Sequence, residues 1–334
     1  SSYLQFLFDT SRDIVAARLA FMMADLKATK FEVSPTGVAT IMLSRPKALN
    51  ALNGDLNREL VRHFGFCDKS PDIKVVVLTG DPASITSSGR TIFCAGADLS
   101  PPKSKPSRPH EAPAVEGASE RATASPWSND SIASHRDGGG VLALTINRCR
   151  KPVIAAINGT AVGGGLTPTL ACDLRIVADD AQIGFVFARR GIVPEAASSY
   201  FLPKLVGVTK AMEWCLSGRV FPAREAHGTG LFNYILPQEE VYPKAMELAA
   251  EIAESCSPSS VTLTKFMLWK QLDGSSPEAA HLLDSRLLQW SFKQPDSVEG
   301  VQSFLQKRSP KFRQTGELPD DFPWWPELDV KSRL

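Results

Sequence analysis

The sequence predicts an α/β fold, in which β-strands and α-helices alternate along the chain. Residues 74–80 (KVVVLTG) and 152–158 (PVIAAIN) are short, continuously apolar runs, typical of strands that are buried on both faces. Segments with apolar residues at helical spacing recur between and after these runs, and such alternation favours an α/β protein. With 334 residues, 43% of them hydrophobic, the chain can bury a full core as one large domain or two small ones.

The composition argues against several classes of function. A formal net charge of +1 provides no basic surface of the kind that nucleic-acid binding requires, and no apolar run is long enough to cross a membrane. The six cysteines show no Cys-x-x-Cys spacing, and the five histidines show no metal-binding spacing. We therefore expect reduced core cysteines in an intracellular protein, with no metal ion and no nucleic-acid or membrane partner.

The first part of the chain is expected to contain a helical extension, a pair of strands and a helix. Residues 1–30 lack a signal-peptide pattern, and their apolar residues fit one face of a helix; a mitochondrial presequence is the competing interpretation, which the acidic residues weaken. Strands at 31–33 and 38–43 flank a Ser-Pro-Thr-Gly turn. Asn53 is placed to cap a helix that ends near Cys67.

A turn of small residues, Phe93–Asp98, follows another segment that resembles a strand. Small residues and Asp occur in any sharp turn, so this turn alone is weak evidence for a site. Residues 100–140 are rich in Pro, Ser and Ala, and we expect them to form a long mobile insertion. A helix is expected at 141–147.

The stretch that organises the chain is residues 151–195. It predicts a strand, a glycine turn at Gly163–Gly165, a helix at Leu166–Cys172, a second strand and a loop that ends at Glu195. Three glycines let backbone amides approach a ligand closely, and amides at a helix start favour an oxygen that becomes negative. Pro168 suits the first helical turn. The same glycines also suit a tight turn in which they only relieve crowding.

The remainder of the chain is predicted to be mostly helical. Helices at 196–205, 210–217 and 223–228 and a strand at 231–236 precede further helices from Tyr242 onward.

We expect three regions in the chain. They are the helical extension 1–30, a core at 31–240 that carries the insertion, and a C-terminal helical region with an irregular tail at 241–334. The tripeptide Ser332-Arg333-Leu334 resembles the Ser-Lys-Leu class of peroxisomal address. We therefore expect a peroxisomal location and the import receptor as a partner, although such a tripeptide also arises by chance.

Four separated motifs together resemble the crotonase family, also called the enoyl-CoA hydratase/isomerase superfamily. They occur in the family's order over about residues 31–270, and they are Ser44–Leu52, Phe93–Asp98, Asn158–Asp173 and Pro194–Tyr200. The resemblance implies an α/β fold of the crotonase type, which is a spiral of repeated β-β-α turns with a C-terminal helical region. It also implies a homotrimer or a hexamer.

In this family two backbone amides polarise the thioester carbonyl of an acyl-CoA, and the resemblance assigns them here to Ala97 and Gly164. Proton removal beside a thioester puts negative charge on its oxygen, and each preorganised N–H donor lowers the barrier by roughly 3 kcal/mol. The coenzyme A thioester is then the substrate, and no cofactor is implied.

The resemblance also places residues near the coenzyme A part of the substrate. Arg45 and Lys47 fall in the segment that usually touches the nucleotide, where they are expected to pair with phosphates, although ordinary surface charges would look the same. Ala95 and Asp98, in the same turn as Ala97, are expected to contribute to coenzyme A binding.

The residue that exchanges protons decides the reaction. Hydratases of the family use two glutamates at positions that hold Thr167 and Phe187 here, which counts against ordinary hydration. The stretch around Glu195 is similar to the peroxisomal 3-enoyl-CoA to 2-enoyl-CoA isomerases, where a Glu at this position is the sole base. We therefore predict an isomerase in which Glu195 takes a proton from C2 and returns it to C4, with its pKa raised by apolar neighbours at 185–187.

Several alternatives stay open. The chain could instead be an enoyl-CoA hydratase or another crotonase-type lyase in fatty-acid or secondary metabolism, or an inactive acyl-CoA-binding protein. Glu195 could simply cap the following helix. Ala196 and Ala197 replace a glycine that the isomerases often have after this Glu. A dehydrogenase or a hydrolase is disfavoured, because the Gly-x-Gly-x-x-Gly and Gly-x-Ser-x-Gly motifs are absent.

Overall fold

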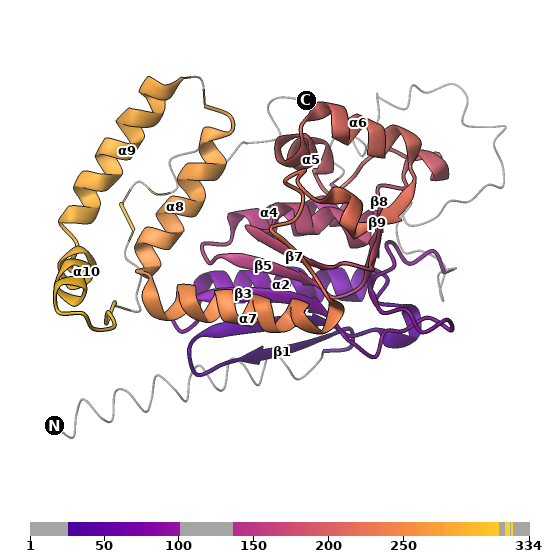
Figure 1. The fold of residues 1–334 in the computed structure, drawn as a ribbon, viewed down its shortest axis with the longest axis horizontal. Helices are drawn as coiled ribbons and strands as arrows, with labels where there is room; N and C mark the ends of the chain where they lie inside the picture. Colours follow the sequence, from indigo (N-terminus) through magenta and orange to yellow (C-terminus); the bar gives the residue numbers. More distant parts are fainter. Residues whose placement is uncertain (1–25, 101–135, 275, 314–317, 321, 323–334) are drawn as a thin grey trace.

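The computed structural model describes residues 26–100, 136–274, 276–313, 318–320 and 322 (Figure 1). Most of the expected helical extension at 1–30, most of the insertion at 100–140 and the terminal tripeptide Ser332-Arg333-Leu334 lie outside the described residues. These three expectations therefore remain predictions.

The main sheet has six strands in the spatial order β1-β2-β3-β5-β7-β10. The β1–β2 pair is antiparallel and every other neighbouring pair is parallel. The strands are β1 Thr29–Val33, β2 Val38–Leu43, β3 Val75–Gly80, β5 Val153–Ile157, β7 Leu174–Ala178 and β10 Tyr234–Leu236. All residues of β3 and β5 are buried, as the continuous apolar runs predict.

A smaller sheet of four strands, in the order β4-β6-β8-β9, lies beside the main one. Its strands are β4 Ile92–Cys94, β6 Thr160–Val162, β8 Gln182–Gly184 and β9 Val220–Pro222. β4, β6 and β8 are parallel, whereas β9 is antiparallel to β8. The chain therefore alternates between the two sheets as it winds, which is the spiral that the resemblance implies.

Helices cover the main sheet on both sides. α7 packs on β3, β5 and β7 across the near face in Figure 1, whereas α2 and α4 pack against each other behind the sheet. The C-terminal helices α8, α9 and α10 extend to the left of the sheets in Figure 1. The helices are α2 Gly54–Lys69, α4 Gly138–Arg148, α5 Ser198–Val206, α6 Val208–Ser217, α7 Gln238–Ser255, α8 Pro258–Gln271, α9 Pro277–Phe292 and α10 Pro295–Leu305, with short 3₁₀ turns η1 Pro46–Ala48, η3 Gly163–Gly165, η4 Thr167–Ala171, η5 Ala188–Arg190 and η6 Ala223–Ala226.

Local signals place most of these elements. The Asn53 side chain accepts a hydrogen bond from Leu56 N at 2.9 Å, which confirms the predicted cap of α2. The predicted helix at Leu166–Cys172 is wrong in type, because the segment forms the 3₁₀ turn η4. The Thr169 hydroxyl donates to Leu166 O at 2.7 Å, and such side-chain bonds to the backbone compete with a regular α-helix.

One buried ion pair ties α8 to the core. Lys265 Nζ lies 2.8 Å from Asp173 Oδ2, and Asp173 also accepts from Val153 N and from Trp269 Nε1. Such a pair is tolerated in the interior because its remaining hydrogen bonds are satisfied.

The described residues hold free cysteines and no group of side chains suited to a metal ion. Their helices also lack the combination of length and apolarity that a bilayer span requires.

Candidate active site

Two parallel strands bring the predicted amide donors together. β4 pairs with β6, with Ile92 opposite Thr160 and Cys94 opposite Ala161. Because the carboxyl ends of parallel strands meet at one edge, the turn after β4, which holds Ala97, reaches the turn after β6, which holds Gly164.

The Ala97 N–H is left open by the way its turn is paired. Leu52 donates to Gly96 O and accepts from Asp98 N, both at 2.8 Å, so the pairing uses the neighbours of Ala97. The Ala97 residue itself is exposed. Gly96 adopts φ +97°, and a Cβ on it would lie 2.9 Å from Val162 O, so this turn requires glycine. The Gly164 N–H lies in the first turn of η3, where amides have no acceptor inside the helix.

The structure brings the three predicted catalytic residues to one place. A Cβ on Gly164 would lie 3.7 Å from Glu195 Oε1 and 3.8 Å from Ala97 N. Two backbone N–H groups and one carboxylate therefore converge on Gly164. An oxygen that gains negative charge between the amides would be stabilised there, while an atom two bonds away would lie beside the carboxylate.

The environment of Glu195 favours its neutral form. Burial raises the pKa of Glu195, and the nearby negative charge of Asp137 raises it further, whereas a hydrogen bond from the Thr167 hydroxyl lowers it. The direction agrees with the prediction made from the apolar residues at 185–187, of which Phe185 and Phe187 are buried. A carboxyl group with a raised pKa holds its proton more readily, which suits proton transfer to a substrate.

The Thr167 hydroxyl can form a hydrogen bond with the Glu195 carboxyl group whether that group is ionised or protonated. Its hydroxyl donates to Glu195 Oε1, and it also lies 3.2 Å from Gly163 O. A hydroxyl has one proton and two acceptor lone pairs. When Glu195 is protonated, the carboxyl can donate to Thr167 Oγ1 while Thr167 donates to Gly163 O. Proton gain and loss at Glu195 therefore leave no buried group without a partner.

The backbone after Glu195 is strained. Ala196 and Ala197 adopt φ +55° and +53°, the left-handed region that glycine favours. Ala197 is the N-cap of α5, and no side chain caps this helix. The capping role considered for Glu195 is therefore not what its side chain does.

Asp137 is a site residue that sequence reasoning missed. Its Oδ1 accepts from Gly140 N at 2.6 Å, which caps α4, and from Ala196 N at 3.4 Å. A Cβ on Gly139 would overlap Glu195 Oε2 and lie 3.2 Å from Asp137 Oδ1, so the two carboxylates flank the same glycine. The only available signal was an Asp before three glycines at the end of the insertion.

The residues predicted to bind coenzyme A lie in the turn that holds Ala97 or in the segment of Arg45 and Lys47. Arg45 Nη2 pairs with Asp98 Oδ2 at 2.9 Å, and hydrogen bonds from Ser100 and from Arg45 hold the pKa of Asp98 below its usual range. Ala95 N donates to Leu49 O, which fixes the start of the turn. Lys47 is exposed and forms no ion pair within the described part of the chain. Phosphate binding by Arg45 and Lys47 stays a prediction.

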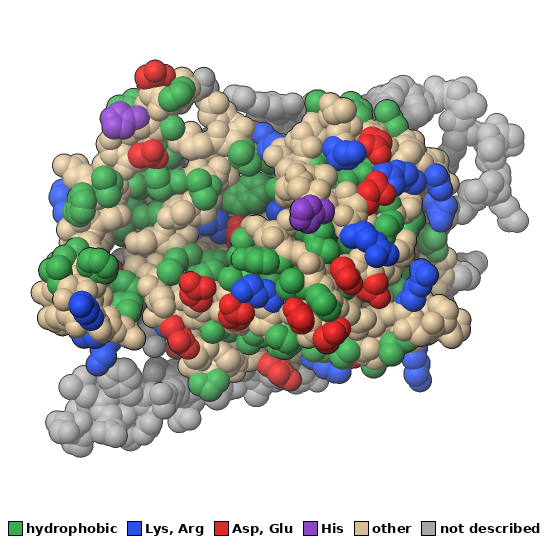
Figure 2. Space-filling model, in the orientation of Figure 1, with side chains coloured by type: hydrophobic (Ala, Val, Ile, Leu, Met, Phe, Trp, Pro, Cys, Tyr) green, Lys and Arg blue, Asp and Glu red, His purple; other side chains and the backbone are tan. Residues whose placement is uncertain are grey.

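An apolar cavity of about 400 Å³ begins two residues after Glu195. Figure 2 shows the molecule hollowed between the C-terminal helices and α5, with apolar side chains in the hollow. The cavity is lined by Leu144, Asn147, Arg148, Ala197, Tyr200, Phe201, Phe266, Trp269, Lys270 and Asp273. Aromatic walls of this kind suit an acyl chain.

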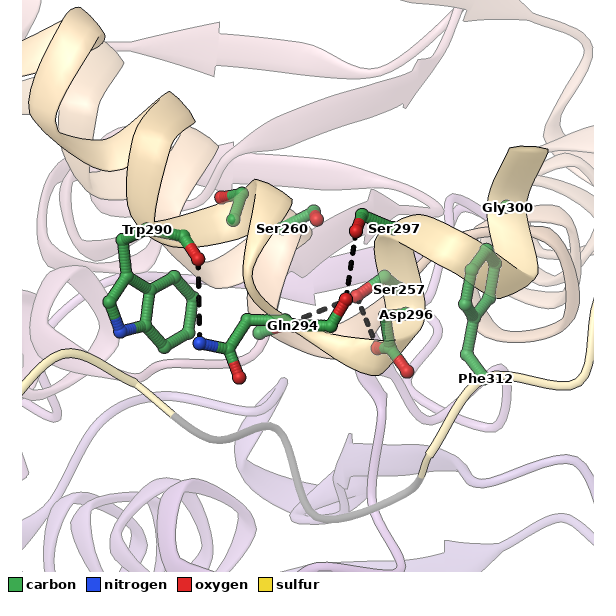
Figure 3. A pocket seen from close by; sticks show the side chains of 10 residues that line it. Ser257, Ser260, Trp290, Gln294, Asp296, Ser297, Gly300 and Phe312 are labelled. Carbon is green, nitrogen blue, oxygen red and sulfur yellow. Dashed lines mark hydrogen bonds between the residues drawn. The ribbon is translucent and has the colours of Figure 1, made fainter.

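A second cavity, of about 230 Å³, lies between α8, α9 and α10, and serines line it together with aromatic residues (Figure 3). The Ser257 hydroxyl donates to Asp296 Oδ2 at 2.6 Å, and the Gln294 side chain donates to Trp290 O at 3.4 Å. These polar groups serve the ends of the three helices.

The fold and the pair of amides beside a carboxylate define the crotonase class of enzymes. A crystal structure of an enoyl-CoA hydratase from Bacillus anthracis matches with a TM-score of 0.70 and 29% identity, covering 87% of this chain and 100% of that one. A probable enoyl-CoA hydratase/isomerase from Mycobacterium abscessus matches with a TM-score of 0.69 and 30% identity, covering 85% of this chain and 98% of that one.

The family model for enoyl-CoA hydratase/isomerase matches residues 34–116 and 126–315, and the chain belongs to this family. An enoyl-CoA hydratase of Alternaria alternata is 39% identical over 280 residues, which cover 84% of each chain. A mevalonyl-coenzyme A hydratase of Beauveria bassiana is 32% identical over 280 residues, which cover 83% of this chain and 92% of that protein.

Proposed function

We propose that this enzyme exchanges a proton at C2 of an enoyl-CoA thioester, with Glu195 as the proton-transfer residue and the Ala97 and Gly164 amides as donors to the thioester oxygen. The convergence of Glu195 Oε1 and Ala97 N on Gly164 carries the proposal. C2 lies two bonds from the thioester oxygen, so an oxygen held by both amides leaves C2 beside the carboxylate. The charge that develops on the oxygen meets preorganised donors.

Hydration of a 2-enoyl-CoA to a 3-hydroxyacyl-CoA is the reaction that we favour. The relatives from Alternaria alternata and Beauveria bassiana are both named as hydratases. The raised pKa of Glu195, caused mainly by burial, suits an acid that delivers a proton to C2 while oxygen adds at C3. The absence of carboxylates at Thr167 and Phe187 means that hydration uses a different pair of groups from the one that the resemblance implies.

Isomerisation of a 3-enoyl-CoA to a 2-enoyl-CoA is the second candidate. It is favoured by the position of the Glu195 carboxylate, which among the described residues is the one that lies against Gly164. One carboxylate can take the proton from C2 and return it to C4, and the Thr167 hydroxyl satisfies it in both states.

The acyl group of the substrate is proposed to occupy the cavity that begins at Ala197. Leu144 and Arg148 line this cavity from α4, the helix whose first turn lies against Glu195. At 1.5 Å per residue, Leu144 lies about 6 Å and Arg148 about 12 Å along the helix from Gly140. An acyl chain leaving C3 would therefore run along α4 between aromatic walls.

The test is a steady-state assay of the full chain with 2-enoyl-CoA and 3-enoyl-CoA substrates offered separately. We expect formation of 3-hydroxyacyl-CoA from the first, and Glu195→Gln should lower kcat at least about 100-fold. Turnover of either substrate that survives Glu195→Gln would rule out the assigned base. Tight binding of enoyl-CoA without turnover of either substrate would instead support an inactive acyl-CoA-binding protein.

Self-association of the chain, as a trimer or a hexamer, is also part of the proposal. Supporting it, α9 and α10 expose several large apolar side chains, and Figure 2 shows apolar side chains over both helices at the left, densely at α10. They are Leu282, Leu288, Phe292, Val298, Val301, Phe304 and Leu305. Sedimentation velocity of the purified chain measures the assembly, and a monomer at micromolar concentration would contradict it.

The peroxisomal location rests on Ser332-Arg333-Leu334 alone. A fluorescent fusion that keeps this tripeptide at a free C-terminus should collect in peroxisomes, and removal of Leu334 should release it. A fusion that stays outside peroxisomes with the tripeptide intact would contradict the proposal.

A further inference from the structure

Asp137 and Glu195 come from distant parts of the chain and meet at the start of α4. Asp137 Oδ1 accepts hydrogen bonds from Gly140 N at 2.6 Å and from Ala196 N at 3.4 Å. The second bond reaches the residue that directly follows Glu195. Gly139, between the two carboxylates, has no side chain to separate them. The same Asp therefore caps a helix and borders the carboxylate of the proposed site.

The other oxygen of Asp137 is available to a ligand. Within the described part of the chain, no donor lies within hydrogen-bond distance of Oδ2, and the residue is exposed. A carboxylate that is fixed through one oxygen and open at the other can bind and deprotonate a water molecule.

We propose that Asp137 is a second catalytic residue, which takes a proton from the water that adds to the double bond while Glu195 delivers a proton to C2. This inference rests on the proposed hydration. One O–H bond of water breaks and its proton moves to Asp137 Oδ2, while the water oxygen bonds to C3. The π electrons of the double bond shift toward the thioester oxygen and then form the C2–H bond with the proton of Glu195. A solvent-mediated transfer from Asp137 to Glu195 restores the starting state, so the net reaction adds one water.

The different environments of Glu195 and Asp137 decide which carboxyl group is the acid and which is the base. Neighbouring negative charges repel each other, so the charge of Asp137 disfavours the ionised form of Glu195. Glu195 is the more buried of the pair, and burial followed by the charge of Asp137 raises the pKa of Glu195. Asp137 is exposed, where water solvates its charge. Glu195 is thus the acid of the pair and Asp137 the base.

The variant Asp137→Asn tests the role directly. Asparagine is nearly the same size and is an equally good N-cap, so α4 is retained. We expect kcat for hydration of a 2-enoyl-CoA to fall about 100-fold or more, with KM changed by less than about threefold and an unchanged melting temperature. Isomerisation of a 3-enoyl-CoA, where the wild-type chain catalyses it, needs only Glu195 and should be retained.

Chemical rescue separates catalysis from helix capping. Added formate should raise kcat of Asp137→Ala several-fold, because it can replace the missing base. It should not raise kcat of the wild-type chain or of Ser276→Ala, which removes the side-chain cap of α9 and deletes no carboxylate. Hydration by Asp137→Asn within about threefold of wild type would overturn the role of Asp137 and leave the proposed function intact. Absence of hydration by the wild-type chain would overturn both the role of Asp137 and the proposed hydration.

Discussion

The Thr167 hydroxyl donates a hydrogen bond to Glu195 Oε1, so the residue that the family resemblance places at a hydratase glutamate position binds the carboxylate of Glu195. The bond favours the ionised form of Glu195 and opposes the effect of burial on its pKa. Thr167 therefore helps Glu195 to give up its proton, against the larger effect of burial.

Thr167→Val should change the pH dependence of catalysis. Valine has the shape of threonine without its donor, so the pKa of Glu195 should rise. The limb of the pH–rate profile that Glu195 controls should then move to higher pH, and kcat/KM at its optimum should fall about tenfold. Thr167→Ser keeps the donor and should behave like wild type. A profile of Thr167→Val that overlays the wild-type one would contradict this role.

Gly139→Ala should abolish activity without unfolding the chain. The added methyl would overlap Glu195 Oε2 and displace the carboxylate. Gly138→Ala is the matched control, because its methyl would lie 3.0 Å from the end of the flexible Asn57 side chain, which can move. Both changes favour a helix by about 1 kcal/mol. We expect at least a 100-fold loss of kcat for Gly139→Ala and less than a threefold change for Gly138→Ala. Equal activities of the two variants would contradict the close approach.

Glu195→Gln should be more stable than wild type at high pH. Burial raises the pKa of Glu195 in the folded state above its unfolded value. The group therefore stabilises the fold most fully below the unfolded pKa of about 4.3, and this contribution is lost as pH rises through the folded pKa. Glutamine stays neutral at every pH. The melting temperature of the variant minus that of wild type should grow between pH 4 and pH 8. A constant difference would show that Glu195 has an ordinary pKa.

Ala197→Gly should stabilise the chain by about 0.5–1 kcal/mol. Alanine in the left-handed conformation costs roughly 1–2 kcal/mol, which glycine avoids. The greater entropy that glycine loses on folding offsets only part of this gain. Ala211→Gly in α6 is the control of opposite sign, because glycine in a regular helix destabilises by about 1 kcal/mol. Chemical denaturation measures both changes. Destabilisation by Ala197→Gly would mean that the strain is not relieved by glycine.

His63 should make the fold sensitive to acid. Its Nε2 lies 2.8 Å from Thr29 Oγ1, whose proton goes to Glu59 Oε2, so Nε2 carries the proton of the neutral ring. Its buried Nδ1 has no partner within the described residues. Burial therefore lowers the pKa of His63 to about 4, against an opposing effect of Glu59.

The stabilising effect of the neutral His63 ring is fully present above the unfolded pKa of about 6.5 and is lost as pH falls through the folded pKa. The loss should be on the order of 3 kcal/mol. In His63→Gln, denaturation midpoints between pH 6.5 and pH 4 should show a correspondingly smaller change. An equal pH dependence in both chains would exclude His63 as its source.

Features that depend on local pattern were predictable from the sequence. The buried strand β3 follows from a continuous apolar run, and the start of α2 follows from Asn53. The turns that hold Ala97 and Gly164 follow from their small residues, whereas their role as amide donors comes from the family resemblance. The parallel pairing of β4 with β6 explains why the two turns meet.

Features that depend on tertiary contact were not predictable. In the sequence Asp137 is only an Asp before three glycines, and its position against Glu195 depends on the fold. No propensity indicates that Ala197 adopts the left-handed conformation, since alanine rarely does so. The short 3₁₀ turn η4 was predicted as a helix because the apolar pattern does not distinguish the two.

The donors that we propose for the thioester oxygen are main-chain N–H groups, and no exchange of one amino acid for another, apart from proline, deletes such a group. After gene duplication, Asp137, Thr167 and Glu195 can therefore change one at a time, and each variant protein along the way still binds the acyl-CoA through these amides. Divergence toward a new reaction then passes through binding-competent ancestors. For the same reason, substitutions of side chains would rarely give resistance to an inhibitor that mimics the thioester enolate.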